Sequence, residues 1–289
     1  MSLTEFAPVS PARRRTDRIM RGLLMAGTAV ALIPLILVLY YLIYRGASSL
    51  NGAFFTTDPT GNFFGNQGGV RSAILGSLEI VGLASLIAIP IGIGVALYLT
   101  EYGKQARFAN VVRYFVDVMT GVPSIVFGLF VYIVLVTSHV GGDFTGWKGS
   151  VALSLLMLPV VVRASEVVLL LVPSGLREAA LALGAPRWRV VSRVVLPTAL
   201  PGLLTGSLLA VARGMGETAP LLFTVSVAFG ATADLGAQMN TLPVQIYNDI
   251  SSPNSALNNR AWGAALTLVL LILIVNLVAR AVARRSRMA

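Results

Sequence analysis

The stretch IVGLASLIAIPIGIGVALYLT, residues 80–100, contains 21 consecutive residues without a charged side chain. A helix needs about 20 predominantly apolar residues to cross the hydrocarbon core of a bilayer, and in lipid a helix satisfies its own backbone hydrogen bonds. Similar runs recur along the 289-residue chain, which is 56% hydrophobic and only 12% charged. Soluble domains average about 25% charged residues. The sequence therefore predicts an all-α integral membrane protein.

Six such runs predict six transmembrane helices. The predicted spans cover residues 22–44, 72–99, 113–137, 149–171, 198–225 and 261–280. The first run follows five arginines and is too long for the apolar core of a signal peptide, so we interpret it as a span. The predicted division is a basic tail (1–21), a six-helix domain (22–283) that includes a loop at 173–197, and a short tail (284–289).

Lysines and arginines are distributed unevenly around these spans. If the N-terminus is inside, the inner segments carry 16 basic residues and the outer segments carry 4, namely Arg45, Arg71, Lys148 and Arg260. Basic residues concentrate in cytoplasmic loops, so both termini are predicted to be cytoplasmic. The formal net charge of +10 then reflects membrane topology rather than a nucleic-acid surface.

Two predicted outer segments, 51–69 and 231–259, are rich in glycine, proline, asparagine or serine. Such composition is typical of turns. We favour the interpretation that they are flexible connectors over the alternative that they form a surface for an external partner.

Several kinds of chemistry have no residues to support them. The chain has no cysteine and a single histidine, His139, so no metal site is predicted. A phosphate-binding Walker A loop ends in Gly-Lys-Ser/Thr, but Lys104 precedes Gln105 and Lys148 follows Trp147. We therefore expect no catalytic residues and no bound cofactor in this chain, and ATP hydrolysis would require another subunit.

The loop at 173–197 has the pattern of a short helix, a break and a second helix. Ser174 can cap the first helix, and Gly184 is suited to its end. Ala179 and Ala180, together with Gly184, leave one helix face almost without side chains. From spacing alone an ordinary loop helix explains this pattern, and a docking surface for another protein is the alternative.

Four charged residues fall within predicted spans. Arg163 and Glu166 are three residues apart, and Arg213 and Glu217 are four apart, so each pair shares a helix face. A charge near the bilayer centre costs about 2.5–3.5 kcal/mol on insertion scales. The pairs either hold helices together or line a path for an anion, which arginine recognises through paired N–H donors. The residue types alone leave both interpretations open.

The loop also resembles a known family. Its pattern EAA, then Gly184, then Val194 before Leu196-Pro197 is similar to the EAA motif of ABC importer permeases, with valine where isoleucine is usual. The resemblance implies the type I importer permease fold, in which this loop is a coupling helix docked on a cytoplasmic ATPase. The coupling residues that it implies are Glu178, Ala179, Ala180 and Gly184.

Further segments resemble the phosphate permeases of such importers. These are RGMGETAPLLFT at 213–224, DVMTGVPSIVFG at 117–128 and RASE at 163–166, while LPVQIY at 242–247 resembles the PstA type of permease rather than the PstC type. The resemblance implies that the transported anion is inorganic phosphate. It also implies that Arg163, Glu166 and Arg213 act on the pathway, with a weaker role for Glu217.

The same resemblance implies a complex in the bacterial cytoplasmic membrane. The expected partners are a second permease of the PstC type, two copies of the ATPase PstB, which bind ATP and Mg, and an external phosphate-binding protein, PstS. Two alternatives are an importer permease for another oxyanion, such as molybdate or sulfate, and a self-contained ion-coupled transporter. The EAA-like loop disfavours the second alternative, because such a transporter has no ATPase to dock.

Overall fold

The structure is a computed structural model that describes residues 10–62, 67–103 and 106–285. The first nine residues of the predicted tail 1–21 and most of the tail 284–289 lie outside this part. Five of its helices are long and apolar enough to cross a membrane, and one bent pair of helices meets the same requirement when its two halves are taken together. The five are α1 (Pro11–Gly46), α3 (Arg71–Leu97), α6 (Gly146–Leu170), α9 (Leu196–Gly216) and α12 (Ser255–Arg285).

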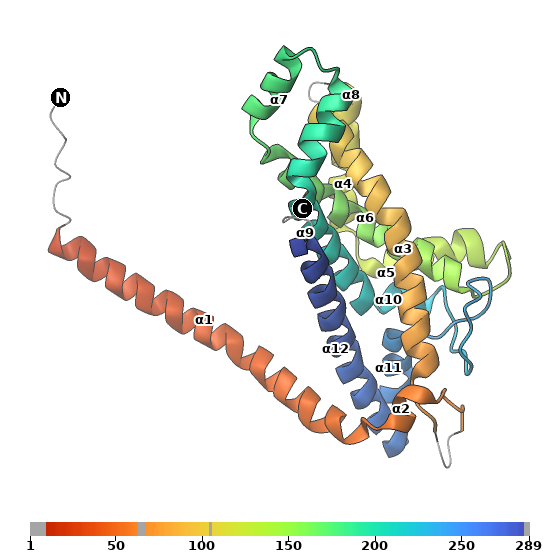
Figure 1. Ribbon diagram of the computed structural model, residues 1–289. Coiled ribbons are helices and arrows are strands. Elements are labelled where there is room, and N and C mark those ends of the chain that lie inside the picture. Colours follow the sequence, from red (N-terminus) through yellow and green to blue (C-terminus); the bar gives the residue numbers. More distant parts are fainter. Residues whose placement is uncertain (1–9, 63–66, 104–105, 286–289) are drawn as a thin grey trace.

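Helices α3 and α6 pack against one another along the bundle (Figure 1). A Cβ atom at Gly149 would lie 3.5 Å from Ile80 Cγ2, and one at Gly92 would lie 2.6 Å from Val161 Cγ1. Both helices therefore advance in parallel at the same level. The chain between them must cross back, and it does so through α4 (Arg107–Gly121) and α5 (Ser124–Val131), which continues as a π-helical turn, Tyr132–Val136.

The prediction of one continuous helix at 113–137 is wrong, because α4 and α5 meet at 103°. Val122 is extended, with φ −73° and ψ 129°, and Pro123 precedes the first turn of α5. A proline restricts the residue before it to extended conformations. The two halves together are nevertheless long and apolar enough for one span, and the parallel direction of α3 and α6 requires such a crossing between them.

The predicted fifth span, 198–225, is also interrupted. Helix α9 ends at Gly216, Glu217 is extended, and a short helix, α10 (Ala219–Leu222), follows. The two breaks are neighbours, since a Cβ atom at Gly128 of α5 would lie 2.6 Å from Pro220 Cα. Glycine allows this close approach of two backbones.

Helix α9 packs antiparallel to α6 with a regular register. Added Cβ atoms at Gly202, Gly206 and Gly214 would lie 2.5, 2.7 and 2.8 Å from Val168, Ala164 and Met157, respectively. Each of these glycines of α9 thus faces one residue of α6. The residue numbers of each facing pair add up to about 370. This register shows which residues of α6 and α9 lie at the same level along the bundle.

One end of the bundle carries α7 (Ser174–Ala182) and α8 (Arg187–Val190), which continues through a π-helical turn, Val191–Val195, into α9. The predicted helix–break–helix is confirmed, and Gly184 has a φ of +78° that favours glycine. The predicted cap is wrong, because Pro173 occupies the N-cap position and no side chain caps α7. Figure 1 shows α7 projecting beyond the long helices.

The opposite end carries α2 (Gly52–Thr56) and α11 (Leu242–Ile250). The prediction that the outer segment 231–259 is a flexible connector is wrong for α11. Leu242, Gln245 and Asp249 of α11 are buried, and α11 packs along α12. This end is therefore a folded and packed part of the domain.

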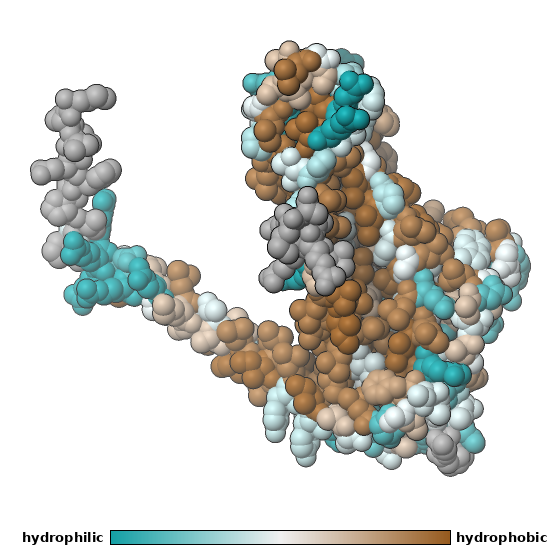
Figure 2. Space-filling view, in the orientation of Figure 1, coloured by the Kyte–Doolittle hydropathy of each residue, from teal (hydrophilic) through white to brown (hydrophobic). Residues whose placement is uncertain are grey.

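Helix α1 leaves the bundle at an angle and touches it only near its last turns (Figure 1). An added Cβ atom at Gly46 would lie 2.8 Å from Leu266 Cβ of α12, while the most apolar window of α1 has no buried residue. Figure 2 shows hydrophobic side chains over α1 and the bundle, with polar side chains at both ends. So large an apolar surface must be covered by lipid or by other subunits.

Candidate functional site

A cluster of four charged residues joins α4 to α6 inside the membrane domain. Arg163 Nη1 donates to Glu166 Oε2 at 2.8 Å, and Arg163 Nη2 donates to Asp117 of α4. Arg113 Nε, also on α4, donates to Glu166 Oε1 at 3.0 Å. The predicted pairing of Arg163 with Glu166 is confirmed, and the cluster adds two residues that the sequence analysis missed.

A sequence signal for the two missed residues existed. Arg113 and Asp117 are four residues apart and so share one face of α4. Arg113 stands at the boundary where the predicted span 113–137 begins, and it is one of the 16 basic residues counted for the inner segments. In the structure it lies within α4, and its Nη2 also donates to the carbonyl of Leu99 at 3.0 Å.

The cluster is electrically balanced but unevenly enclosed. Two arginines face two carboxylates, so the formal charges cancel. The Glu166 side chain is 9% exposed, that of Arg163 is 34% exposed and that of Asp117 is 60% exposed. One side of the Arg163 guanidinium is thus held in the protein interior, while the other faces an accessible space.

The second predicted pair lies at the end of α9. Arg213 Nε donates to Glu217 Oε1 at 3.4 Å, and the Arg213 side chain is 52% exposed. Within the described part of the chain this is the single hydrogen bond that the Arg213 side chain makes. Its remaining N–H donors are available to a ligand.

The two pairs lie at different depths. In the α6–α9 register, Arg163 is level with about residue 207, since Ala164 faces Gly206. Arg213 is six residues further along α9, which corresponds to about 9 Å at 1.5 Å per residue. No ion pair joins the two sites among the residues that the structure describes. The structure therefore holds two separate arginine sites along one helix pair.

The predicted coupling residues lie together at the α7 end. Glu178, Ala179 and Gly184 are exposed, and Ala180 is half-buried. Arg177 fixes this end, because its guanidinium donates to Glu101 at 2.8 and 3.0 Å and to the carbonyls of Leu169 and Val172 at 2.8 and 2.6 Å. The small-residue face is accessible on a helix that is firmly attached to the bundle.

Lys148 was assigned to an outer loop, but it lies in α6 and is fully buried. Its Nζ donates to three carbonyls, those of Leu135, Gly142 and Asp143, at 3.0, 2.5 and 2.7 Å. This lysine therefore ties the end of the broken span to α6. No group of three or more histidine, cysteine, aspartate or glutamate residues suited to a metal ion occurs in residues 10–62, 67–103 and 106–285.

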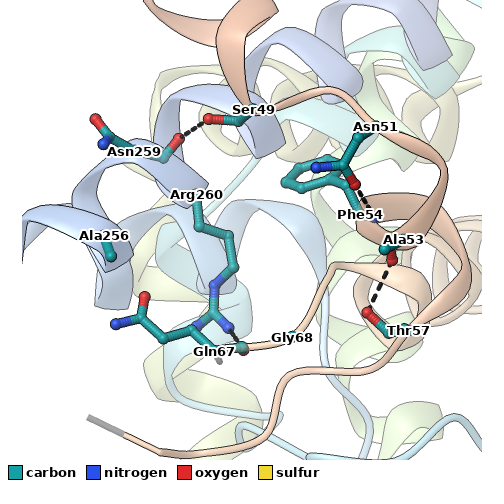
Figure 3. Close-up of a pocket in the computed structure, with 10 residues that line it drawn as sticks. All are labelled: Ser49, Asn51, Ala53, Phe54, Thr57, Gln67, Gly68, Ala256, Asn259 and Arg260. Atoms are coloured by element: carbon teal, nitrogen blue, oxygen red, sulfur yellow. Dashed lines mark hydrogen bonds between the residues drawn. The ribbon is translucent and has the colours of Figure 1, made fainter. Parts of the chain in front are cut away.

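Arg260 was likewise assigned to an outer loop, but it is buried at the α2 end. Its Nε and Nη2 donate to Asp249 at 2.7 and 2.8 Å, and its Nη1 donates to the carbonyl of Gln67. Figure 3 shows its guanidinium beside Gln67 at the edge of a cavity of about 320 Å³. The Asp249 and Arg260 side chains are 5% and 8% exposed, which makes this a closed ion pair.

Known proteins match this sequence along nearly its whole length. The family model of the binding-protein-dependent transport system inner membrane component matches residues 88–288. A phosphate transport system permease protein PstA of Yersinia pestis is 42% identical, covering 95% of this chain and 92% of that protein. A PstA 1 of Mycobacterium tuberculosis is 40% identical over 98% of this chain and 93% of that protein.

Solved structures share the fold at lower identity. A chain of a bacterial alginate ABC transporter has a TM-score of 0.65 and 17% identity, covering 95% of this chain and 96% of that one. A chain of the MetNI methionine ABC transporter, in an inward-facing conformation, has a TM-score of 0.62 and 21% identity, covering 74% of this chain and 94% of that one. These likenesses confirm the predicted importer permease fold. This chain belongs to the binding-protein-dependent inner membrane transport components and, within them, to the PstA permeases.

Proposed function

We propose that this chain is the membrane-spanning permease subunit of an ATP-driven importer that moves inorganic phosphate across the bacterial cytoplasmic membrane. The observation that carries this proposal is the pair of partly exposed arginines, Arg163 and Arg213, at two depths of one apolar bundle. Relatives named as phosphate transport permeases over nearly the whole chain support phosphate as the anion.

The chemistry of the two arginines fits a pathway for an oxyanion. Lipid offers nothing that replaces the hydration of phosphate, whereas a guanidinium supplies several N–H donors in one plane. Glu166 and Glu217 hold the arginines and partly neutralise them. A transported ion must leave as well as enter, so a weakened site is an advantage.

The partners follow from the same proposal. A PstC-type permease pairs with this chain, two PstB ATPases bind ATP and Mg, and PstS delivers phosphate from outside. Glu178, Ala179, Ala180 and Gly184 form the surface of α7 that meets the ATPase. The closed α2 end provides a firm surface toward the external binding protein.

The test is transport by the purified complex in vesicles that contain ATP. We expect phosphate accumulation that requires the ATPase and that excess sulfate or molybdate does not inhibit. Accumulation without the ATPase would indicate a self-contained transporter. Preference for sulfate or molybdate would assign another oxyanion.

The orientation is tested separately, because both termini are proposed to be cytoplasmic. The chain has no cysteine, so single cysteines report topology directly. Ala233→Cys, near the α2 end, is expected to react with an impermeant reagent in intact cells, whereas Leu183→Cys, beside α7, reacts only after permeabilisation. The reverse pattern would invert the domain and remove α7 from the ATPase.

A further inference from the structure

We propose that Asp117 is an internal competitor for the transported anion, occupying Arg163 when the site is empty and being displaced when phosphate binds. This inference rests on the proposed function. It adds a residue to the pathway and gives Asp117 a role in setting how tightly the anion is held.

The contacts of Arg163 divide into a fixed side and a replaceable side. On the fixed side, Glu166 accepts from Arg163 at 2.8 Å and from Arg113 at 3.0 Å, and it is 9% exposed. Arg113 is itself anchored to the carbonyl of Leu99 at 3.0 Å. Separating Glu166 from Arg163 would leave this buried carboxylate with Arg113 as its one remaining charged partner in the described chain, which is costly.

The replaceable side consists of Asp117 alone. Within the described chain its carboxylate pairs with Arg163 and with no other group, and it is 60% exposed. On a water-filled transport path an accessible carboxylate regains water when its partner leaves, so its release costs little there. An arriving anion would therefore exchange with Asp117 rather than with Glu166.

The exchange is chemically matched. Carboxylate and phosphate both accept paired hydrogen bonds from a guanidinium, so Asp117 presents to Arg163 the same kind of oxygen as the cargo. While Asp117 is bound, the four charges of the cluster balance. If phosphate were added without release of Asp117, the surplus negative charge would lie inside an apolar bundle, which is unfavourable.

The position of Asp117 links this exchange to the shape of the broken span. Asp117 lies in the last turns of α4, just before the break at Val122–Pro123. Arg113, one turn earlier, remains attached to Glu166. Release of Asp117 thus frees the end of α4 that joins α5, while the Arg113 contact serves as the pivot.

The kinetic experiment compares Asp117→Asn with the wild type in the whole complex reconstituted in vesicles. Asparagine retains the size but loses the charge that competes with phosphate. We expect the KM for phosphate to fall several-fold and the maximal rate per complex to fall as well, because release slows. Asp117→Glu, which retains the charge, is expected to behave nearly as the wild type. Asp143→Asn, an exposed aspartate in the loop before α6, is the matched control and should change neither value.

Two outcomes would overturn the inference. If KM and maximal rate per complex are unchanged in Asp117→Asn, Asp117 does not compete with the anion. If only the amount of assembled complex falls, the pair is structural. Arg163→Gln distinguishes a failure of this inference from a failure of the proposed function. If Arg163→Gln transports phosphate normally, Arg163 is not on the pathway. If Arg163→Gln loses transport while Asp117→Asn behaves as the wild type, only the competition by Asp117 is refuted.

A spectroscopic readout tests the linked movement. Spin labels at Val118→Cys on α4 and Val167→Cys on α6 occupy exposed positions, and the partner subunits would be made free of cysteine. We expect added inorganic phosphate to change the distance distribution, and Asp117→Asn to give the changed distribution without phosphate. A distribution that responds to neither would overturn the proposed exchange.

Discussion

Arg260 and Arg163 both lie in the apolar domain with acidic partners, but they differ in how completely those partners enclose them. Arg260 makes two hydrogen bonds to Asp249, and both side chains are less than one-tenth exposed. Arg163 is one-third exposed and holds a partner, Asp117, that is largely exposed. A closed pair cannot exchange its partner without stranding a charge, whereas an open pair can. We infer that the closed pair maintains the fold and the open arginines serve transport.

The largest effect that follows from this comparison is expected at Arg213, which is the most open of these arginines. Arg213→Gln should reduce phosphate uptake per assembled complex to background while leaving the amount of complex unchanged. Arg213→Lys should restore uptake only in part, because lysine keeps the charge but loses the planar array of donors. Uptake normalised to purified complex measures both.

An opposite pattern at Arg213 would remove the distinction between open and closed pairs. If Arg213→Gln lowers only the amount of complex, and each surviving complex transports normally, Arg213 is structural. Arg21→Gln, in an exposed pair with Asp17 on α1, is the matched control and should affect neither quantity.

The closed pair should show the complementary behaviour. Asp249→Asn leaves the buried Arg260 without its charged partner, and breaking a buried pair from one side costs about 3–5 kcal/mol. We expect less complex and a lower midpoint of thermal unfolding, with normal uptake in each complex that assembles. Asp143→Asn, in an exposed pair, should retain wild-type stability. Normal stability together with lost uptake would place Arg260 on the pathway.

The sequence predicted what is local and missed what depends on long-range packing. The run at 149–171 corresponds closely to α6, Gly146–Leu170, because hydropathy and length suffice. Arg163 and Glu166 were paired correctly because one helix carries both. Their partners on α4 required knowledge that α4 docks antiparallel against α6, which no local spacing contains.

The two broken spans show a different limit. Apolar residues lie on both sides of Val122–Pro123 and of Glu217–Pro220. Hydropathy therefore indicates a membrane environment without indicating the direction in which the chain runs. Proline and glycine marked both breaks, but these residues are also common in unbroken membrane helices. Lys148 illustrates the same point, since its charge indicated a loop while its three carbonyl partners allow burial.

A smaller effect is expected at Gly184, where coupling rather than anion contact is at stake. Gly184 has a φ of +78°, and a residue with a Cβ atom in this conformation costs about 1–2 kcal/mol. Gly184→Val should therefore disturb the corner between α7 and α8 and lower phosphate-stimulated ATP hydrolysis several-fold. Gly22→Val, on α1 and away from the α7 end, with open space around it, is the matched control. Equal, normal hydrolysis in both variants would make the loop a simple connector.

The smallest effect is expected at Asp58, which forms an ion pair with Arg71 at the α2 end. This pair is partly exposed, unlike the buried pair of Arg260 with Asp249 at the same end. The hydrogen bonds that Arg71 donates, at 2.5 and 3.1 Å, hold the pKa of Asp58 below its ordinary value, although desolvation opposes the shift. A carboxyl with a lowered pKa stabilises the folded state above its unfolded pKa of about 3.9, and this stabilisation disappears as pH falls through the folded pKa. Asp58→Asn should thus lower the unfolding midpoint slightly at neutral pH and not at all in strong acid. The double variant Asp58→Asn, Arg71→Gln should lose no more stability than either single variant. If the loss of stability in Asp58→Asn were the same in acid as at neutral pH, the ion pair would not be its source.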